Sequence, residues 1–356
     1  MALKIVAVDL FCGAGGLTRG LLDAGVEVRK GFDNDGRLKD TFEKNNPGAK
    51  FISKDVADIT GKDILEGINR DDCFLLLAGC APCQPFSSML KVTGKKKKRD
   101  SRVNLLLEFG RLIIAVKPDF VFAENVPGLK NGKGKRIFRK FERILEKEGY
   151  RFVSDTLDAK DYGVPQKRRR LVLLASLHGQ VTIPYPTHGT HKKATLRYIT
   201  VQDAIKRFPV IRAGSRHKKI VNHETRDLSD LNKKRLRYIK KNGGSRTDLP
   251  GRLALKCHKD HEGHTDVYGR MKWEELAPTL TCKCTSLSNG RFGHPSQLRA
   301  ISVREAAALQ TFNDDYIFYG NISENTRWVG NAVPPRFAGY LVREGLIKSV
   351  NGGIRE

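Results

Sequence analysis

The chain begins with an apolar segment, a glycine-rich loop and an amphipathic segment in direct succession. Residues 3–10 are mostly apolar and predict a buried parallel strand. Residues 11–16 (Phe-Cys-Gly-Ala-Gly-Gly) then form a tight turn, and leucines at 17, 21 and 22 follow at helical spacing. Because missing side chains let a ligand approach the backbone, this order predicts a cofactor-binding α/β fold. The loop has no Gly-Lys-Ser/Thr, which argues against a nucleoside triphosphate.

Two aspartates follow the next predicted strands. Asp33 ends the strand predicted over 26–32 and lies twenty residues beyond Gly13, where a carboxylate can accept both hydroxyl protons of a ribose. Asp55 follows Phe51 and Ile52 and can meet an adenine amino group. Capping is the alternative for both, because Asp33 or Asp35 precedes a helical run over 36–45.

A cysteine stands at the end of another predicted strand. The apolar run 74–78 stops at Gly79, and Pro82 and Pro85 each lack the backbone donor that a continuing strand needs. Ligands bind at the carboxyl ends of strands in open α/β sheets. Cys83, between the two prolines, is therefore a candidate nucleophile, and a small buried residue is the alternative.

Charged residues follow two further strands. A helix over 105–116 ends at Pro118, residues 119–123 predict a strand, and Glu124 stands at its carboxyl end, on the same edge as Cys83. A charge next to an apolar strand end is costly unless it has a partner or a task. Helices are also predicted over 135–148, over 302–310, where Ser302 and Glu305 form a capping box, and over 336–348, and strands are predicted over 150–157 and 171–175. Between those two strands, Arg168 and Arg170 alternate along an extended segment and so point to one face.

The charge predicts a polyanionic partner. The 65 Lys and Arg against 39 Asp and Glu leave a net charge of +26, which favours nucleic acid over a merely solvated surface. Residues 91–102 hold seven basic residues and one acid, so they predict either a disordered loop or a mobile lid that closes over a phosphate backbone. The predicted DNA contacts in this run are Lys95, Lys96, Lys97, Lys98 and Arg99.

From about residue 178 the α/β pattern gives way to a basic, turn-rich segment. Residues 206–241 contain 13 Lys and Arg against three Asp and Glu, so 178–266 predicts a smaller domain that contacts nucleic acid. Its candidate base readers are Arg246, Thr247, Arg252 and Lys256. The cysteines and histidines over 257–264 and at 282 and 284 fit no ordinary zinc spacing, and no metal is predicted.

The cellular location follows from what the sequence lacks. There is no signal peptide and no 18-residue apolar run, and the seven cysteines are scattered. These features predict a reducing cytoplasm, without a membrane.

Taken together, six motifs resemble the cytosine-5 DNA methyltransferase family of the prokaryote type. In chain order they lie at residues 9–16, 82–84, 124–126, 166–170, 304–310 and 330–335. The resemblance covers residues 3–176 and 267–347, and the segment between takes the place of the family's variable target-recognition domain. The implied division is a catalytic part over 1–177, target recognition over 178–266, and a return over 267–356. Trp328 departs from the family pattern, where glutamine is common.

The resemblance implies a Rossmann-like fold that binds S-adenosylmethionine, leaves S-adenosylhomocysteine and methylates carbon 5 of a cytosine flipped out of duplex DNA. Cys83 would attack carbon 6, Glu124 would contact N3, Arg168 and Arg170 would hold the cytosine carbonyl and the backbone, and Gln84 would hold the opened duplex. The cofactor residues implied are Phe11, Cys12, Gly13, Gly15, Gly16, Leu17, Asp33, Asp55, Val56, Leu105, Asn331 and Val333.

Further expectations concern how the enzyme works in its host. A monomer with a separate cognate restriction endonuclease, acting near the nucleoid, is expected. The alternatives are a transfer RNA cytosine-5 methyltransferase and a basic DNA-binding protein that has lost the chemistry.

Overall fold

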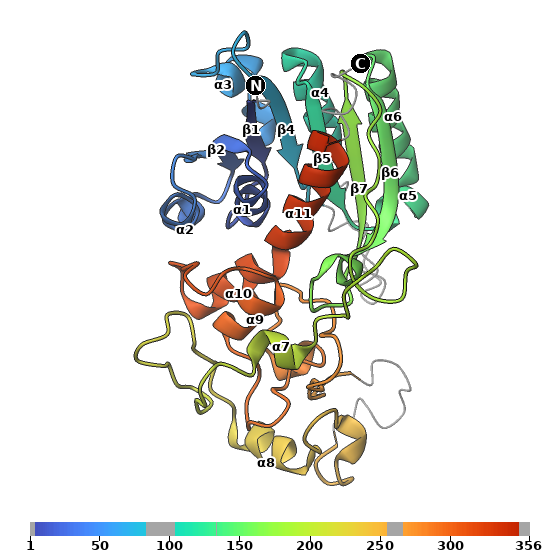
Figure 1. Ribbon diagram of the computed structural model, residues 1–356. Coiled ribbons are helices and arrows are strands. Elements are labelled where there is room, and N and C mark those ends of the chain that lie inside the picture. Colours follow the sequence, from blue (N-terminus) through green and yellow to red (C-terminus); the bar gives the residue numbers. More distant parts are fainter. Residues whose placement is uncertain (1–3, 83–103, 133, 255–265, 349–356) are drawn as a thin grey trace.

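The computed structural model describes residues 4–82, 104–132, 134–254 and 266–348. Figure 1 shows two lobes, a sheet flanked by helices and a second lobe with α7 to α10 and long loops. Helix α11 leads from the second lobe back to the sheet. No helix among the described residues is long and apolar enough to cross a bilayer.

The sheet has seven strands in the order β3-β2-β1-β4-β5-β7-β6. The strands are β1 (Ile5–Leu10), β2 (Glu27–Asp33), β3 (Lys50–Ser53), β4 (Phe74–Gly79), β5 (Phe120–Asn125), β6 (Arg151–Asp158) and β7 (Arg169–Ser176). Strands β1 to β5 are parallel, whereas β7 is antiparallel to both β5 and β6. The strand order reverses between β1 and β4, and a ligand crevice is expected at such a switch point. The predicted α/β fold is confirmed.

The helices cover both faces of the sheet and build the second lobe. They are α1 (Gly16–Asp23), α2 (Lys39–Asn45), α3 (Gly61–Leu65), α4 (Leu105–Val116), α5 (Gly128–Asn131), α6 (Lys135–Lys147), α7 (Val201–Ile205), α8 (Asp230–Tyr238), α9 (Val303–Leu309), α10 (Ile322–Asn331) and α11 (Pro335–Val342). The helix predicted over 36–45 is instead a 3-10 turn at Gly36–Leu38 followed by α2, and the last helix ends in a π-type turn at Arg343–Ile347.

Alternate residues of each central strand enter different cores, as the period of a strand requires. In β4, Leu76 and Ala78 face one core and Leu75 and Leu77 face the other. The second of these cores contains α4 and α6, the first contains α1 and α11. Helices α1 and α11 pack closely where Gly20 faces Gly339. A Cβ added to Gly339 would lie 2.7 Å from the Gly20 carbonyl oxygen, so a larger residue would not fit there. The C-terminal part of the chain thereby completes the core that the N-terminal part begins.

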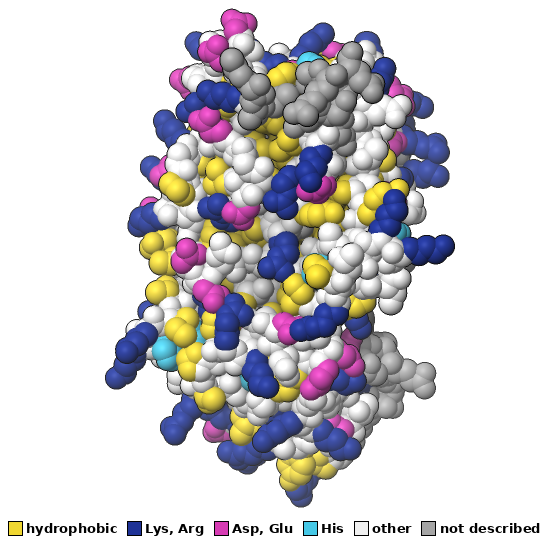
Figure 2. Space-filling view, viewed as in Figure 1, with side chains coloured by type: hydrophobic (Ala, Val, Ile, Leu, Met, Phe, Trp, Pro, Cys, Tyr) yellow, Lys and Arg dark blue, Asp and Glu magenta, His cyan; other side chains and the backbone are white. Residues whose placement is uncertain are grey.

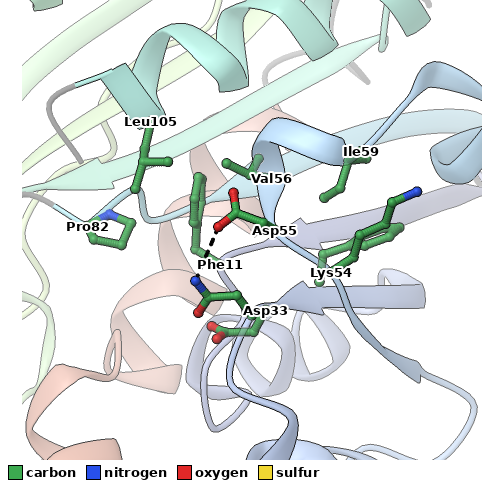
Figure 3. Close-up of a pocket in the computed structure, with 10 residues that line it drawn as sticks. Phe11, Asp33, Lys54, Asp55, Val56, Ile59, Pro82 and Leu105 are labelled. Atoms are coloured by element: carbon green, nitrogen blue, oxygen red, sulfur yellow. Dashed lines mark hydrogen bonds between the residues drawn. The ribbon is translucent and has the colours of Figure 1, made fainter. Parts of the chain in front are cut away.

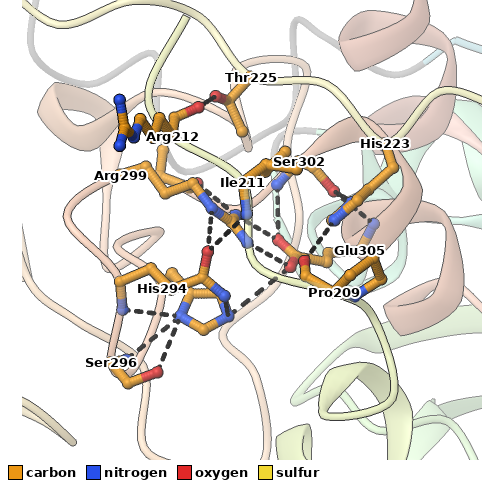
Figure 4. A network of polar contacts seen from close by, with 12 residues as sticks. Pro209, Ile211, Arg212, His223, Thr225, His294, Ser296, Arg299, Ser302 and Glu305 are labelled. Carbon is orange, nitrogen blue, oxygen red and sulfur yellow. Dashed lines mark hydrogen bonds and ion pairs between the residues drawn. The ribbon is translucent and has the colours of Figure 1, made fainter. Parts of the chain in front are cut away.

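A buried ion pair organises the start of α9 in the second lobe (Figure 4). Arg299 donates to both carboxylate oxygens of Glu305 at 2.7 Å, and both side chains are fully buried. Glu305 also accepts from the Ser302 backbone, so the capping box predicted for these two residues is confirmed. His223 joins the network through Ser302 Oγ at 2.9 Å and the Pro209 carbonyl at 2.8 Å. Segments around 209, 223 and 299–305 are therefore held together by polar contacts that are largely buried.

We expect the stability of the protein to fall below neutral pH because of His294. Burial lowers the pKa of His294 to about 4, from 6.5 in the unfolded chain. Between these values the unfolded chain binds the proton and the folded chain does not, so stability is full above pH 6.5 and decreases toward pH 4. One such proton contributes at most about 1.4 kcal/mol per pH unit. Urea unfolding of the wild type and of His294→Gln between pH 7.5 and 4.5 checks this, and equal pH slopes would contradict it.

Candidate active site

A pocket lies at the carboxyl edge of the sheet, beside the switch point between β1 and β4 (Figure 3). It is lined by Phe11, Phe32, Asp33, Asn34, Lys54, Asp55, Val56, Ile59, Pro82 and Leu105. Five of these residues were predicted to bind the cofactor, namely Phe11, Asp33, Asp55, Val56 and Leu105. The remaining five were not predicted. Each strand or loop reaches this edge because β1, β2, β3 and β4 run parallel and end together.

Asp33 is fixed to the glycine loop. Its Oδ2 accepts from the Gly13 backbone at 3.0 Å, and its Oδ1 accepts from the Asp35 backbone at 3.0 Å. Burial raises the pKa of this carboxyl above its usual range. The cap of the following 3-10 turn is Asp35, which accepts from the Arg37 backbone, so the capping alternative for Asp33 is wrong.

Asp55 both caps a turn and lines the pocket. It caps the 3-10 turn Val56–Asp58 by accepting from the Ala57 backbone at 3.0 Å, and it also lines the pocket. Asn34 donates to its other oxygen at 3.4 Å. The capping alternative for Asp55 is thus confirmed, and it leaves the carboxylate at the pocket wall.

The glycine loop approaches its neighbours so closely that side chains cannot fit. Gly15 has φ 82°, and a Cβ added to it would lie 2.6 Å from the hydroxyl oxygen of Tyr316. A Cβ on Gly16 would lie 2.4 Å from the Val333 carbonyl oxygen. By contrast, Gly13 has φ 53° and open space where a Cβ would be.

The other predicted cofactor residues lie around this loop and not among the residues that line the pocket. Cys12 and Leu17 are buried at the start and end of the loop, Val333 is buried against Gly16, and Asn331 is exposed at the end of α10. Apolar walls from Phe11, Val56 and Leu105 with carboxylates at one side suit a nucleoside that offers a flat base and hydroxyl or amino donors. The residues present therefore fit the adenosyl part of S-adenosylmethionine.

Glu124 is buried at the end of β5 with a partner for each carboxylate oxygen. Arg170 Nε forms an ion pair with Oε1 at 3.0 Å, and the Cys80 thiol donates to Oε2 at 2.8 Å. Burial and the neighbouring Glu124 charge raise the pKa of Cys80 well above its usual value, so Cys80 stays a thiol. The sequence placed Glu124 and Arg170 in one site, but it gave no role to Cys80.

Arg168 is fully enclosed beside this pair. It donates to the carbonyl oxygens of Leu280 at 3.3 Å and of Ala332 at 3.0 Å, and burial together with the Arg170 charge lowers its pKa to about 9. Two distant segments, at 280 and 332, are thus attached to the strand that carries Arg170.

Two buried glutamines that the sequence reasoning did not single out connect the same segments. Gln166 donates to Gln310 Oε1 at 2.8 Å and accepts from the Leu280 backbone at 2.8 Å. Gln310 in turn donates to the carbonyl oxygens of Val329 and Ala332. Both glutamines occur in the motifs recognised from the sequence, which is the only signal that would have found them.

The segment that leads to Cys83 touches both parts of the site. Asn125 donates to the Ala81 carbonyl at 3.1 Å, Cys80 contacts Glu124, and Pro82 lines the cofactor pocket. Cys83 itself lies outside the described residues, as do Gln84 and the basic residues Lys95, Lys96, Lys97, Lys98 and Arg99.

The second lobe carries three of the four predicted DNA readers. Arg246 and Thr247 belong to a 3-10 turn, and Arg252 donates to the Tyr238 hydroxyl at 3.1 Å. Lys256 lies outside the described residues, together with the candidate zinc ligands over 257–264. The described residues contain no group of three His, Cys, Asp or Glu that could hold a metal ion.

Comparisons with known proteins agree with this geometry. The family model of C-5 cytosine-specific DNA methylases matches residues 5–346. The Type II methylase M.HgiDII of Herpetosiphon aurantiacus is 40% identical over 355 residues, which cover 98% of this chain and 96% of that protein. The Type II methyltransferase M1.HphI of Haemophilus parahaemolyticus is 33% identical, over 97% of this chain and 87% of its own.

Solved structures share the fold. A putative DNA modification methyltransferase encoded within a prophage (E. coli) superposes with a TM-score of 0.74 at 23% identity, over 99% of this chain and 100% of that chain. Spodoptera frugiperda DNMT2 gives a TM-score of 0.65 at 14% identity, over 96% of this chain and 99% of that chain.

The expectations of a Rossmann-like fold, a methyltransferase activity and S-adenosylmethionine as methyl donor are therefore confirmed. The match extends across the pocket, Glu124, the arginines and the returning helix α11. The chain belongs to the C-5 cytosine-specific DNA methylase family.

Proposed function

We propose that the chain methylates carbon 5 of a flipped cytosine in a specific duplex sequence, with Cys83 as nucleophile. Carbon 5 of cytosine is a poor nucleophile until a thiolate adds to carbon 6 and turns the ring into an enamine. Attack by Cys83 forms the sulfur–carbon 6 bond. Loss of the carbon 5 proton and β-elimination later break that bond and free Cys83. S-adenosylmethionine, when bound, supplies an electrophilic methyl group.

The described residues have separate tasks in this proposal. Glu124 contacts the N3 edge and the amino group of cytosine, and it hydrogen-bonds or protonates N3 as negative charge develops there. Arg170 holds the Glu124 carboxylate by the ion pair described above. In this proposal it also contacts the cytosine carbonyl. Arg168 holds the backbone at Leu280 and Ala332. Phe11 and Val56 pack against adenine, while Asp33 binds the ribose and Asp55 the adenine amino group.

Basic side chains suit a duplex that passes along both lobes. Figure 2 shows Lys and Arg side chains distributed over the sheet lobe and the second lobe alike. Base flipping needs contacts that hold the opened duplex, which we assign to Gln84 and the basic residues Lys95 to Arg99. Sequence reading is assigned to residues 178–266, with Arg246, Thr247, Arg252 and Lys256 as readers. The catalytic parts would then be 1–177 and 267–356.

The biological setting is part of the same proposal. Relatives named Type II methylases support a role in a restriction-modification system, with a cognate endonuclease acting separately. A monomer suits an enzyme that modifies one strand at a time. We expect it to work in the cytoplasm, close to the nucleoid.

The observation that carries the proposal is the position of residues 80–82. Cys80 contacts Glu124, Ala81 accepts from Asn125, and Pro82 lines the cofactor pocket. Cys83 is the next residue along the chain, which supports its assignment as the nucleophile. Cys80 is half-buried and its thiol donates to Glu124, and its raised pKa favours the thiol over the thiolate, so we do not assign the nucleophile to Cys80.

The test is methyl transfer from labelled S-adenosylmethionine to duplex DNA and, in parallel, to transfer RNA. Duplex DNA is expected to be labelled. Bisulfite sequencing of DNA from cells that express the chain should then show one recurrent sequence in which one cytosine resists conversion. Labelling of transfer RNA alone would favour the RNA enzyme. Cofactor binding with no transfer to either substrate would favour a protein without the chemistry.

A further inference from the structure

The hydroxyl of Tyr316 contacts the glycine loop from a segment 302 residues away in sequence. It donates to the carbonyl oxygen of Ala14 at 2.5 Å. Tyr316 lies between α9 and α10 and is 2% exposed. Its ring packs against Phe312, with centroids 4.6 Å apart, and against Phe318 at 5.4 Å. The direction of the hydroxyl is therefore set by a rigid aromatic cluster.

This contact completes the anchoring of one peptide unit in the loop. The unit between residues 14 and 15 is planar, so fixing its two ends fixes its orientation. At one end the Gly15 N–H donates to the Cys12 carbonyl at 2.9 Å, and at the other the Ala14 carbonyl accepts from Tyr316. A buried carbonyl that lost this donor would be left without a partner, which is unfavourable.

The hydroxyl is itself held in place as a donor. Asn46 Nδ2 donates to it at 3.0 Å, and the same amide donates to the Phe42 carbonyl at 2.8 Å. Burial raises the pKa of Tyr316, so the hydroxyl keeps its proton. The hydroxyl and the amide together occupy the space where a side chain at position 15 would be. The observed shape of the loop therefore satisfies the Ala14 carbonyl, the Tyr316 hydroxyl and the Asn46 amide together.

We propose that Tyr316 is a positioning residue for the cofactor, which acts by holding the loop over residues 13–16 in the shape that binds S-adenosylmethionine. The proposal rests on the assignment of this loop to the cofactor. The reach to the pocket is short, because Gly13, the residue before Ala14, donates to the Asp33 carboxylate at the pocket wall. The Cys12 carbonyl that accepts from Gly15 belongs to the same peptide unit as the Gly13 N–H, so a tilt of the 14–15 peptide would move that N–H away from Asp33.

The experiment compares Tyr316→Phe with Tyr150→Phe, each of which removes a single buried hydroxyl. Tyr150 is a matched control because it also donates to a backbone carbonyl at 2.5 Å, that of Pro118, and is 5% exposed. Pro118 precedes β5, so this contact lies at the amino edge of the sheet, opposite the pocket. Both variants should lose thermal stability to a similar extent.

The two variants should differ in how they bind S-adenosylmethionine without DNA, measured by titration calorimetry. For Tyr316→Phe we expect the Kd to rise about tenfold, which corresponds to about 1.4 kcal/mol and lies within the range for one buried carbonyl left unsatisfied. The KM for the cofactor should rise while kcat and the KM for DNA stay near wild type. Tyr150→Phe should bind the cofactor as the wild type does.

Two outcomes would overturn the proposal. One is a Tyr316→Phe protein with wild-type Kd, and the other is an equal rise in both variants, which would trace the effect to general stability. Because cofactor binding is measured without any nucleic acid, either result is separate from a failure to methylate DNA. Protection of the loop amides against hydrogen exchange gives a second readout, which should fall in Tyr316→Phe alone.

Discussion

Replacing Cys83 by serine is expected to lower the rate of methyl transfer by about 10³-fold or more, since a serine hydroxyl is a far weaker nucleophile than a thiolate near neutral pH. Binding of S-adenosylmethionine should be unchanged, because the pocket is lined by other residues. Single-turnover transfer of a labelled methyl group to duplex DNA measures the first effect, and calorimetry measures the second. Trapping on DNA that contains 5-fluorocytosine should give a covalent complex with the wild type only.

The matched control for this variant is Cys73→Ser. Cys73 lies just before β4, at the amino edge of the sheet, and its thiol donates to the Asn69 carbonyl at 3.0 Å. Its substitution should leave both transfer and trapping unaffected. Robust turnover by Cys83→Ser would rule out the covalent mechanism, whereas loss of activity in both variants would point to a general sensitivity to cysteine replacement.

Glu124→Gln is the second change with a large expected effect. The neutral amide keeps the shape of the side chain but can neither pair with Arg170 nor supply a proton to N3. We expect kcat to fall by about 10²- to 10⁴-fold, the range for losing a positioned general acid or base. The KM for S-adenosylmethionine should stay the same, because Glu124 is not among the residues that line the cofactor pocket. Rapid-quench measurement of the methyl transfer step separates this from slow product release.

Glu146→Gln serves as its control, because Glu146 is exposed on α6 and is not among the residues that line the cofactor pocket. This variant should behave as the wild type. Cys80 also contacts Glu124, because its thiol donates to the Glu124 carboxylate. A kcat for Glu124→Gln within about twofold of wild type would remove Glu124 from the chemical step.

Local patterns were sufficient to predict the parts of the site that each strand delivers. The strands that precede Phe11, Asp33 and Glu124 were predicted from the short segments 3–10, 26–32 and 119–123. Parallel strands end at one edge, so residues that follow them are brought together whatever the rest of the chain does. The capping box of Ser302 and Glu305 was equally local, because its two members are three residues apart.

Local patterns were not sufficient for the turn at residues 36–38 or for the direction of the last two strands. The period of apolar residues is the same in a strand that runs parallel or antiparallel to its neighbour. The insertion of β7 between β5 and β6, antiparallel to both, is visible only in the folded chain. It is this insertion that brings Arg170 to Glu124.

The sequence by itself determined the α/β architecture, the cofactor edge and the family, because these depend on residue spacing within short segments and on motifs in a fixed order. Tertiary structure alone decided which distant polar groups meet. Gln166 and Gln310 are 144 residues apart, and Tyr316 and Ala14 are 302 apart. No periodicity links such partners, since each pair meets only when segments far apart in the sequence pack together and leave a buried donor facing a buried acceptor.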